Sequence, residues 1–330
     1  MQTASEIVTT AREPERAPEN ASARSNLPDR AWAAALGVLG LGVLVVAAVI
    51  VAELVRIGWP AMTHTGIVAF ITTSVWDVTR DVFGALPFIY GTLVTSVVAL
   101  VLALPVSVGL ALFLTEMAPP SLKSIVSFPI SLLAGIPSVV YGLWGLFVLV
   151  PILRKVVEPA LAKAFGFLPL FQGPPIGLGY LAAGVVLAIM ILPTITSIAI
   201  EVLQTVPGAL REAALALGAT RWEAIRVSVL PYARAGIVGA TMLGLGRALG
   251  ETMAVTMVIG NSPEIHASLF AAGYSLPSVI ANEFAEATSA VHTGVLAALA
   301  LILFGITFLL NSVARLLVRA VTKSQLKARV

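Results

Sequence analysis

Residues 205–251 read TVPGALREAALALGATRWEAIRVSVLPYARAGIVGATMLGLGRALGE, a polar stretch that runs directly into a glycine-rich apolar helix. Gly218 suits the left-handed backbone position that follows the last turn of a helix. Thr220 and Glu223 fit a capping box that opens a second helix, and we expect Pro231 to end that helix. The stretch therefore predicts two short helices joined around Gly218, followed by a membrane-spanning helix.

The composition excludes several classes of protein. Apolar residues make up 58% of the 330 residues, charged residues make up 11%, and the mean hydropathy is +0.98, which is typical of a polytopic membrane protein. The chain has no cysteine, so it has neither a disulfide nor a thiolate metal site. Its net charge of +3 comes from basic residues that flank apolar runs, so we expect no nucleic-acid partner. The three histidines match no metal-ligand spacing, and we expect ordinary polar roles and no metal.

The apolar runs predict an all-α polytopic membrane protein, because about 20 helical residues cross the core of a bilayer. A mixed-charge stretch at residues 1–30 is expected to be a disordered tail, and residues 31–330 a transmembrane domain in the lipid bilayer. The polar elbow at 205–231 separates the fourth span from the fifth. The six predicted spans are about 31–55, 89–114, 125–150, 180–200, 233–259 and 293–317.

Proline and glycine interrupt the third predicted span at Pro129, Gly135 and Pro137. Such a break within the membrane is tolerated only where protein or a water-filled path satisfies the freed backbone groups. Ser138 and Tyr141 follow the break directly. They are candidates to line a substrate pathway, and packing roles remain an equal alternative.

The distribution of Lys and Arg predicts the orientation of the spans. Because successive spans alternate in direction, 14 basic residues lie on the side that holds both termini and the elbow, and 5 lie on the other side. The positive-inside rule therefore places both termini and the elbow in the cytoplasm. The remaining basic residue, Arg247, lies inside the fifth span.

Arg247 and Glu251 are the charged residues well inside the fifth span, and they share a helical face with Gly236, Ala240 and Gly244. A cation within the bilayer costs about 2.5–3.5 kcal/mol on insertion scales, so this face must meet groups that offset the cost. Small residues allow close helix approach, which predicts that the face meets the bundle interior or a partner subunit.

Two interpretations of this charged pair remain open. In the first, Arg247 and Glu251 form an i,i+4 ion pair that only neutralises both charges inside the bundle. In the second, the guanidinium binds an oxyanion through its planar donors, and the carboxylate tunes the site. We favour the second, because intramembrane ionisable residues commonly mark a pathway.

The elbow resembles the EAA loop of the membrane subunits of bacterial ABC importers, although Ser228 stands where the family commonly has an apolar residue. The resemblance implies an importer type I permease-like bundle whose cytoplasmic coupling helix seats in a groove of a separate ATPase subunit. The matching residues are Glu212, Ala213, Ala214, Gly218, Leu230 and Pro231.

Four further runs narrow the resemblance to the PstC-type phosphate importer permeases, over about residues 83–320. These are FGALPFIYGTLVTS at 83–96, LAGIPSVVYGLWG at 133–145, GLGRALGETMAV at 244–255 and SVIANEF at 278–284. The resemblance implies a bacterial inner-membrane complex for inorganic phosphate, with a PstA-like permease, two PstB-like ATPase copies and a PstS-like extracytoplasmic binding protein. It also implies a transport role for the charged pair of the fifth span.

Three other functions compete with that of a PstC-type phosphate permease. A permease for molybdate or sulfate is the main alternative, and the sister A-type phosphate permease chain is another. A membrane enzyme is disfavoured because no side-chain cluster has a catalytic spacing. The chain also lacks the G-x-x-x-x-G-K-[ST] stretch that cradles nucleotide phosphates, so ATP and magnesium are expected on the partner ATPase and no cofactor on this chain.

Overall fold

The computed structural model describes residues 27–327, and within them the chain divides into two units between Ala52 and Glu53. Helix α1 (Leu27–Thr65) belongs to both units. Its side chains from residue 30 to residue 50 are exposed, and the predicted tail lies outside the described residues except for 27–30, which are helical.

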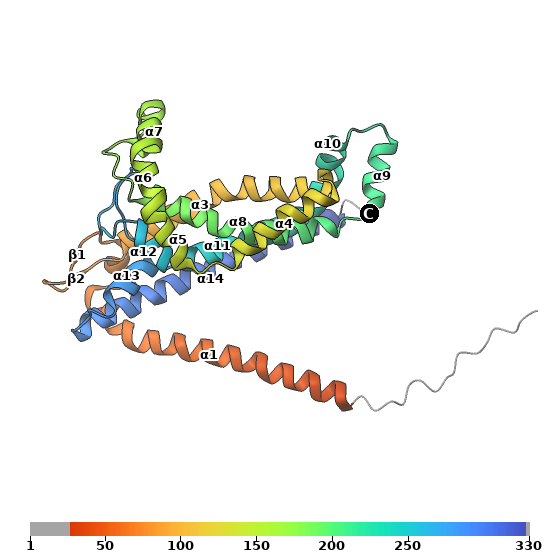
Figure 1. Ribbon diagram of the computed structural model, residues 1–330. Coiled ribbons are helices and arrows are strands. Elements are labelled where there is room, and N and C mark those ends of the chain that lie inside the picture. Colours follow the sequence, from red (N-terminus) through yellow and green to blue (C-terminus); the bar gives the residue numbers. More distant parts are fainter. Residues whose placement is uncertain (1–26, 328–330) are drawn as a thin grey trace, which may run out of the picture. The chain divides into compact units, whose positions relative to one another are not determined.

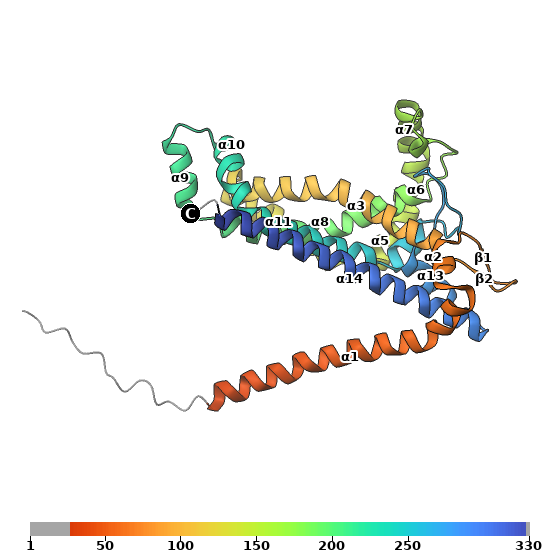
Figure 2. The same ribbon diagram turned by 180° about the vertical axis from the view of Figure 1, so that it is seen from behind.

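The second unit is a bundle of long helices. Helices α3 (Leu86–Leu112), α8 (Tyr180–Gln204), α11 (Leu230–Gly250) and α14 (Ala290–Lys327) run side by side, and α8 packs against both α3 and α11 (Figures 1 and 2). Gly58 in the second half of α1 packs tightly against the backbone of α14, where an added Cβ would lie 2.8 Å from the Ala298 nitrogen.

Shorter elements cover the two ends of this bundle. Helices α9 (Gly208–Ala216) and α10 (Arg221–Ala224) lie at one end. At the other end lie the hairpin of β1 (Trp76–Asp77) and β2 (Val82–Phe83), α7 (Glu158–Phe165) and α13 (Leu276–Glu283) (Figures 1 and 2). The other elements are α2 (Ile67–Thr72), α4 (Pro120–Ala134), α5 (Ser138–Trp144), α6 (Val150–Ile152), η5 (Pro169–Phe171) and α12 (Met253–Val258).

Within the described residues, six helices are long and apolar enough to cross a membrane, which confirms the predicted all-α membrane fold. Two of the predicted spans are wrong in their bounds. The third crossing helix is Ser138–Phe165 and not 125–150, and Pro120–Ala134 forms a shorter helix of its own. The fifth is Arg221–Gly250 and not 233–259, because the helix breaks after Gly250.

Four five-residue π-helical segments precede prolines in the bundle. The helix continues through Pro151, Pro159 and Pro231, whereas it ends at Met117 before Pro119, because Ala118 is extended. Proline lacks the N–H for the i→i−4 bond and its ring clashes with that carbonyl, and a π turn widens the helix locally. Each segment ends two residues before a proline. Because the helix continues through Pro231, the expectation that this residue ends a helix is wrong. The segments are η2 (Phe113–Met117), η3 (Gly145–Leu149), η4 (Leu153–Val157) and η6 (Ile225–Val229).

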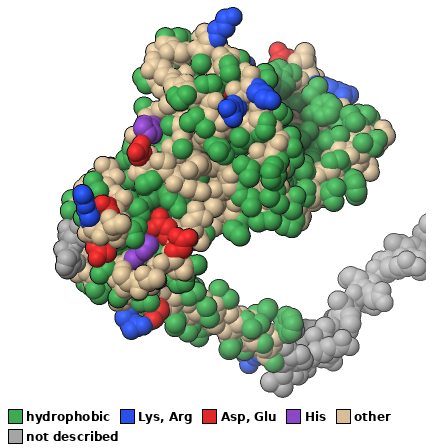
Figure 3. Space-filling model, turned by 60° about the vertical axis from the view of Figure 1, so that its left-hand side comes forward, with side chains coloured by type: hydrophobic (Ala, Val, Ile, Leu, Met, Phe, Trp, Pro, Cys, Tyr) green, Lys and Arg blue, Asp and Glu red, His purple; other side chains and the backbone are tan. Residues whose placement is uncertain are grey.

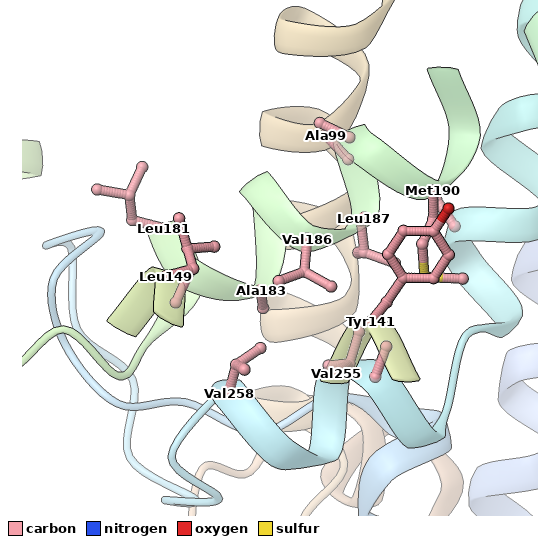
Figure 4. Packing of buried hydrophobic residues seen from close by; sticks show 14 of the residues in the cluster. Ala99, Tyr141, Leu149, Leu181, Ala183, Val186, Leu187, Met190, Val255 and Val258 are labelled. Carbon is pink, nitrogen blue, oxygen red and sulfur yellow. The ribbon is translucent and has the colours of Figure 1, made fainter. Parts of the chain in front are cut away.

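The largest buried cluster joins α3, α5, α8 and α12. Figure 4 shows the side chains of Ala183 and Val186 on α8 and of Val258 on α12 directed toward one another. Tyr141 of α5 belongs to the same cluster. This packing holds α5 and α12, which each follow a break in a longer helical segment, against the central helix α8.

Candidate functional site

Two interrupted helical segments pack against each other in the bundle. The segment α4–α5 is broken at residues 135–137, and the segment α11–α12 is broken at residues 251–252. Helix α5 packs on α12 through Gly142, where an added Cβ would lie 3.0 Å from the Ala254 Cα. Two stretches of irregular backbone therefore lie at the ends of a tightly packed helix pair.

Arg247 lies in the last turn of α11, where the negative end of the helix favours a cation. Its Nη1 donates a hydrogen bond to the Thr194 hydroxyl of α8 at 3.3 Å. This is the one hydrogen bond of the guanidinium within the described residues, and the side chain is partly exposed. Because a guanidinium has five N–H donors, most of its capacity remains for an anion.

Tyr141 of α5 bridges the break before that helix. Its hydroxyl donates a hydrogen bond to the Leu133 carbonyl at 2.7 Å, so it satisfies one of the backbone groups that the break frees. Ser138 stands in the first turn of α5 and is partly exposed. The two candidate pathway residues after this break therefore differ in exposure. Ser138 is partly exposed, whereas Tyr141 is buried and hydrogen-bonded to the backbone.

Glu251 sits at the second break and leaves the helical conformation, with φ −71° and ψ 126°. Its carboxylate accepts a hydrogen bond from the Ala254 N–H at 3.2 Å and so opens α12. Within residues 27–327 no ion pair joins Glu251 to Arg247. The structure therefore does not contain the neutralising pair of the first interpretation.

The small-residue face of α11 lies against α8. A Cβ at Gly236 would lie 2.4 Å from the Val202 side chain, and one at Gly244 would lie 2.6 Å from the Ile195 side chain. Ala240, between them, is buried. The face that carries Arg247 consequently meets the central helix of the bundle and brings Arg247 to Thr194.

The elbow has the predicted local structure. Gly218 has φ +87°, and the Thr220 hydroxyl and Glu223 carboxylate form a reciprocal capping box at the start of α10. Both predicted turn signals are confirmed. Large apolar side chains of the elbow are nonetheless exposed, with Leu217 at 90% and Trp222 at 59%.

The six residues of the EAA spacing occupy different environments on this elbow. Glu212 and Ala213 on α9 are exposed, and Ala214 is half-buried. Gly218 and Pro231 are exposed, while Leu230 is half-buried at the start of α11. These residues lie along α9 and the beginning of the helix that carries Arg247.

Sequence patterns did not identify Thr194, nor the ion pair between Arg211 and Glu116, whose closest atoms are 2.6 Å apart. These contacts join residues 53 and 95 positions apart, so no local spacing predicts them. Glu158 is also buried, and its carboxylate accepts a hydrogen bond from the Gly177 N–H at 2.9 Å.

Two histidines lie beside glutamate carboxylates. His292 Nε2 lies 2.9 Å from the Glu283 carboxylate, which also accepts a hydrogen bond from the Trp76 indole at 3.2 Å. Nearby, burial raises the pKa of the Tyr274 phenol to about 12, which keeps it protonated near neutral pH. Figure 3 shows acidic side chains beside the histidines on the face that it draws. Residues 27–327 hold no group of three or more potential metal ligands, and His266 and His292 each lie beside a glutamate carboxylate.

Comparisons with known proteins identify the family of this chain. The model of the binding-protein-dependent transport system inner membrane component family matches residues 92–323. A phosphate transport system permease protein PstC of Mesorhizobium japonicum is 50% identical over 261 residues, covering 78% of this chain and 80% of the relative. The protein of the same description from Pasteurella multocida is 45% identical over 287 residues, covering 86% and 89%.

Solved structures show the same fold. A bacterial alginate ABC transporter chain, solved with its alginate-bound periplasmic protein, has a TM-score of 0.60 at 16% identity and covers 89% of this chain and 96% of its own. An inward-facing MetNI methionine ABC transporter chain has a TM-score of 0.55 at 21% identity and covers 71% and 94%. The chain therefore belongs to the binding-protein-dependent transport system inner membrane components, and among them to the PstC-type permeases.

Proposed function

We propose that this chain is one of two membrane-spanning subunits of an ATP-driven importer that carries inorganic phosphate across a bacterial plasma membrane. The observation that carries the proposal is the 45–50% identity to relatives that are described as phosphate transport permeases. The six crossing helices and the shared importer fold support the same conclusion.

We infer that phosphate passes the broken-helix site at Arg247. The guanidinium uses one donor on Thr194 and offers the others to an oxyanion, to which planar N–H pairs are well matched. Ser138 and Glu251 are partly exposed next to the two breaks. Their hydroxyl and carboxylate are suited to hydrogen-bond a protonated phosphate, which has both donor and acceptor oxygens.

We further infer that the elbow seats in the groove of a separate ATPase. Trp222 supports this, because it is 59% exposed on the elbow and tryptophan is enriched among the residues that anchor protein interfaces. The excess of Lys and Arg on the same side of the spans supports a cytoplasmic elbow and cytoplasmic termini. ATP and magnesium then bind to the two ATPase copies and not to this chain.

The expected complex contains this chain, a PstA-like permease, two PstB-like ATPases and a PstS-like binding protein. The experiment that tests the function is ATP-driven uptake into vesicles that hold this complex, measured with labelled phosphate, sulfate and molybdate in parallel. Uptake of phosphate above that of the other two anions is expected. Equal or faster uptake of sulfate or molybdate, or uptake that does not need ATP, would contradict the proposal.

A further inference from the structure

Glu116 lies at the end of the second crossing helix, a position that is electrostatically unfavourable for a carboxylate. It lies in η2, the last turn that continues α3, where unpaired carbonyl groups make the helix end negative. Its side chain is only 9% exposed. A carboxylate with so little water at this end of a helix needs a cation beside it.

Arg211 of α9 supplies that cation. Its Nε donates to both Glu116 carboxylate oxygens, at 3.0 and 3.2 Å, and its Nη2 donates to one of them at 2.6 Å. The same guanidinium donates from Nη1 to the Val206 carbonyl at 2.7 Å and from Nη2 to the Leu203 carbonyl at 3.2 Å. One side chain of the elbow therefore joins the end of α3–η2 to the end of α8.

The covalent connection between α8 and α9 is short, at residues 205–207, and α9 is exposed on much of its surface. A force applied to α9 alone would bend this connection unless another contact held it. The guanidinium makes that contact, because it fixes α9 to the carbonyl end of α8 and to α3–η2 together. Figures 1 and 2 show the elbow at the end of the bundle where α3 and α8 finish.

The two helices that Arg211 joins lead to the candidate phosphate site. Helix α3 packs along α8, and the Ser107 hydroxyl donates to the Leu192 carbonyl of α8 at 3.2 Å. Two residues further along α8, Thr194 accepts the hydrogen bond from Arg247. A displacement of α9 that moves α8 therefore reaches the site through contiguous packed elements.

We propose that Arg211 and Glu116 form a coupling clamp, which makes the elbow move as one body with α3 and α8 and so transmits ATPase closure to the site at Arg247. The inference rests on the proposed function of the elbow. Both residues are positioning residues, since they act through α3 and α8. The clamp is distinct from the residues of the EAA spacing and supplies a connection within this chain.

The alternative is that the pair only stabilises the fold, because removing one partner of a buried pair leaves the other charge uncompensated. A coupling role predicts a change that a stabilising role does not. The quantity to measure is phosphate transported per ATP hydrolysed, in the complete complex and at a temperature well below its melting point. A structural role would lower the amount of assembled complex and leave this ratio unchanged.

Glu116→Gln and Arg211→Gln should each lower the transport ratio by about fivefold or more, the lower end of typical couplings between linked sites. Lys123→Gln, which removes a cation from the neighbouring helix α4, is the matched control and should leave the ratio unchanged. If either variant fails to assemble, Arg211→Lys replaces it, because Lys keeps the charge and cannot make the forked contacts.

A covalent tether gives the decisive readout. The chain has no cysteine, so Glu116→Cys with Arg211→Cys introduces its only thiols, in a complex whose other subunits have been freed of cysteine. A short bismaleimide that joins the two thiols should restore the ratio that the double variant has lost. An unchanged ratio in the untethered variants, or no recovery on tethering, would overturn the clamp. If the unmodified complex itself carries no phosphate, the proposed function fails instead.

Discussion

The elbow at Gly218 and the break at Glu251 interrupt the same stretch of chain, and they are built differently. At the elbow, the side chains of Thr220 and Glu223 accept hydrogen bonds from each other's backbone N–H groups. Nothing lies within 4 Å of a Cβ added at Gly218. At the break, α12 is held by α5, which contacts it at Gly142. The turn of the elbow at Gly218 is therefore shaped by local residues alone, while the break also needs packing from a distant helix.

This difference suits the two proposed roles, which are docking on the ATPase for the elbow and passage of phosphate for the break. A segment that docks on a separate ATPase needs its own folded shape and an exposed surface, and the elbow has both. A site inside the membrane must have its irregular backbone satisfied by surrounding protein. At the break, the Glu251 carboxylate and the Thr252 hydroxyl bond to nearby backbone groups, and packing on α5 completes the enclosure.

The largest expected effect comes from filling the contact between α5 and α12. Gly142→Leu would place side-chain atoms against the Ala254 backbone, and such overpacking typically costs about 1–3 kcal/mol of the free energy of unfolding. We expect a lower melting temperature of the complex and loss of phosphate uptake. Gly109→Leu in α3, where nothing lies within 4 Å of an added Cβ, is the control. Equal behaviour of the two variants would show that the break does not depend on this contact.

A smaller effect, confined to the elbow, is expected from Gly218→Val. The left-handed backbone at φ +87° costs a non-glycine residue about 1–2 kcal/mol, and no packed neighbour adds to that strain. The melting temperature should change little, while less ATPase should co-purify with the permease.

Gly218→Asn is the matched variant, because Asn tolerates the left-handed conformation, and it should retain the ATPase. Full co-purification and transport with Gly218→Val would contradict the docking role of the elbow. A large fall in melting temperature would contradict the local character of the turn at Gly218.

The same contrast explains what could be predicted from the sequence. Gly218, Thr220 and Glu223 are local signals, so the turn and the cap of the elbow were predictable. The number of spans followed from the apolar runs. The end expected at Pro231 was wrong, because the π segment η6 carries the helix through a residue that normally breaks it.

Features that depend on distant contacts were not predictable. The break at Glu251 is stabilised by α5, which lies more than a hundred residues earlier in the chain. The contact of Arg247 with Thr194 and that of Arg211 with Glu116 arise only when α3, α8 and α11 pack together. Sequence spacing placed Arg247 on the small-residue face, and only the fold shows which helix this face meets.

The clamp connects the two regions of the comparison. If local residues shape the turn of the elbow, the elbow binds the ATPase even when the clamp is broken, and only the transmission to α8 is lost. Glu116→Gln should therefore retain the ATPase, unlike Gly218→Val. This pair of outcomes separates docking on the ATPase from coupling to the site.

The most direct measurement of the central claim is ATP-driven phosphate uptake by the assembled complex that carries Arg247→Gln. The account predicts background uptake with normal membrane insertion and normal ATPase co-purification, because the change removes the charged, forked guanidinium and leaves the elbow intact. Arg234→Gln, an exposed basic position on the same helix, is the control and should retain uptake. Full phosphate uptake by the Arg247→Gln complex would contradict the claim that phosphate passes this arginine.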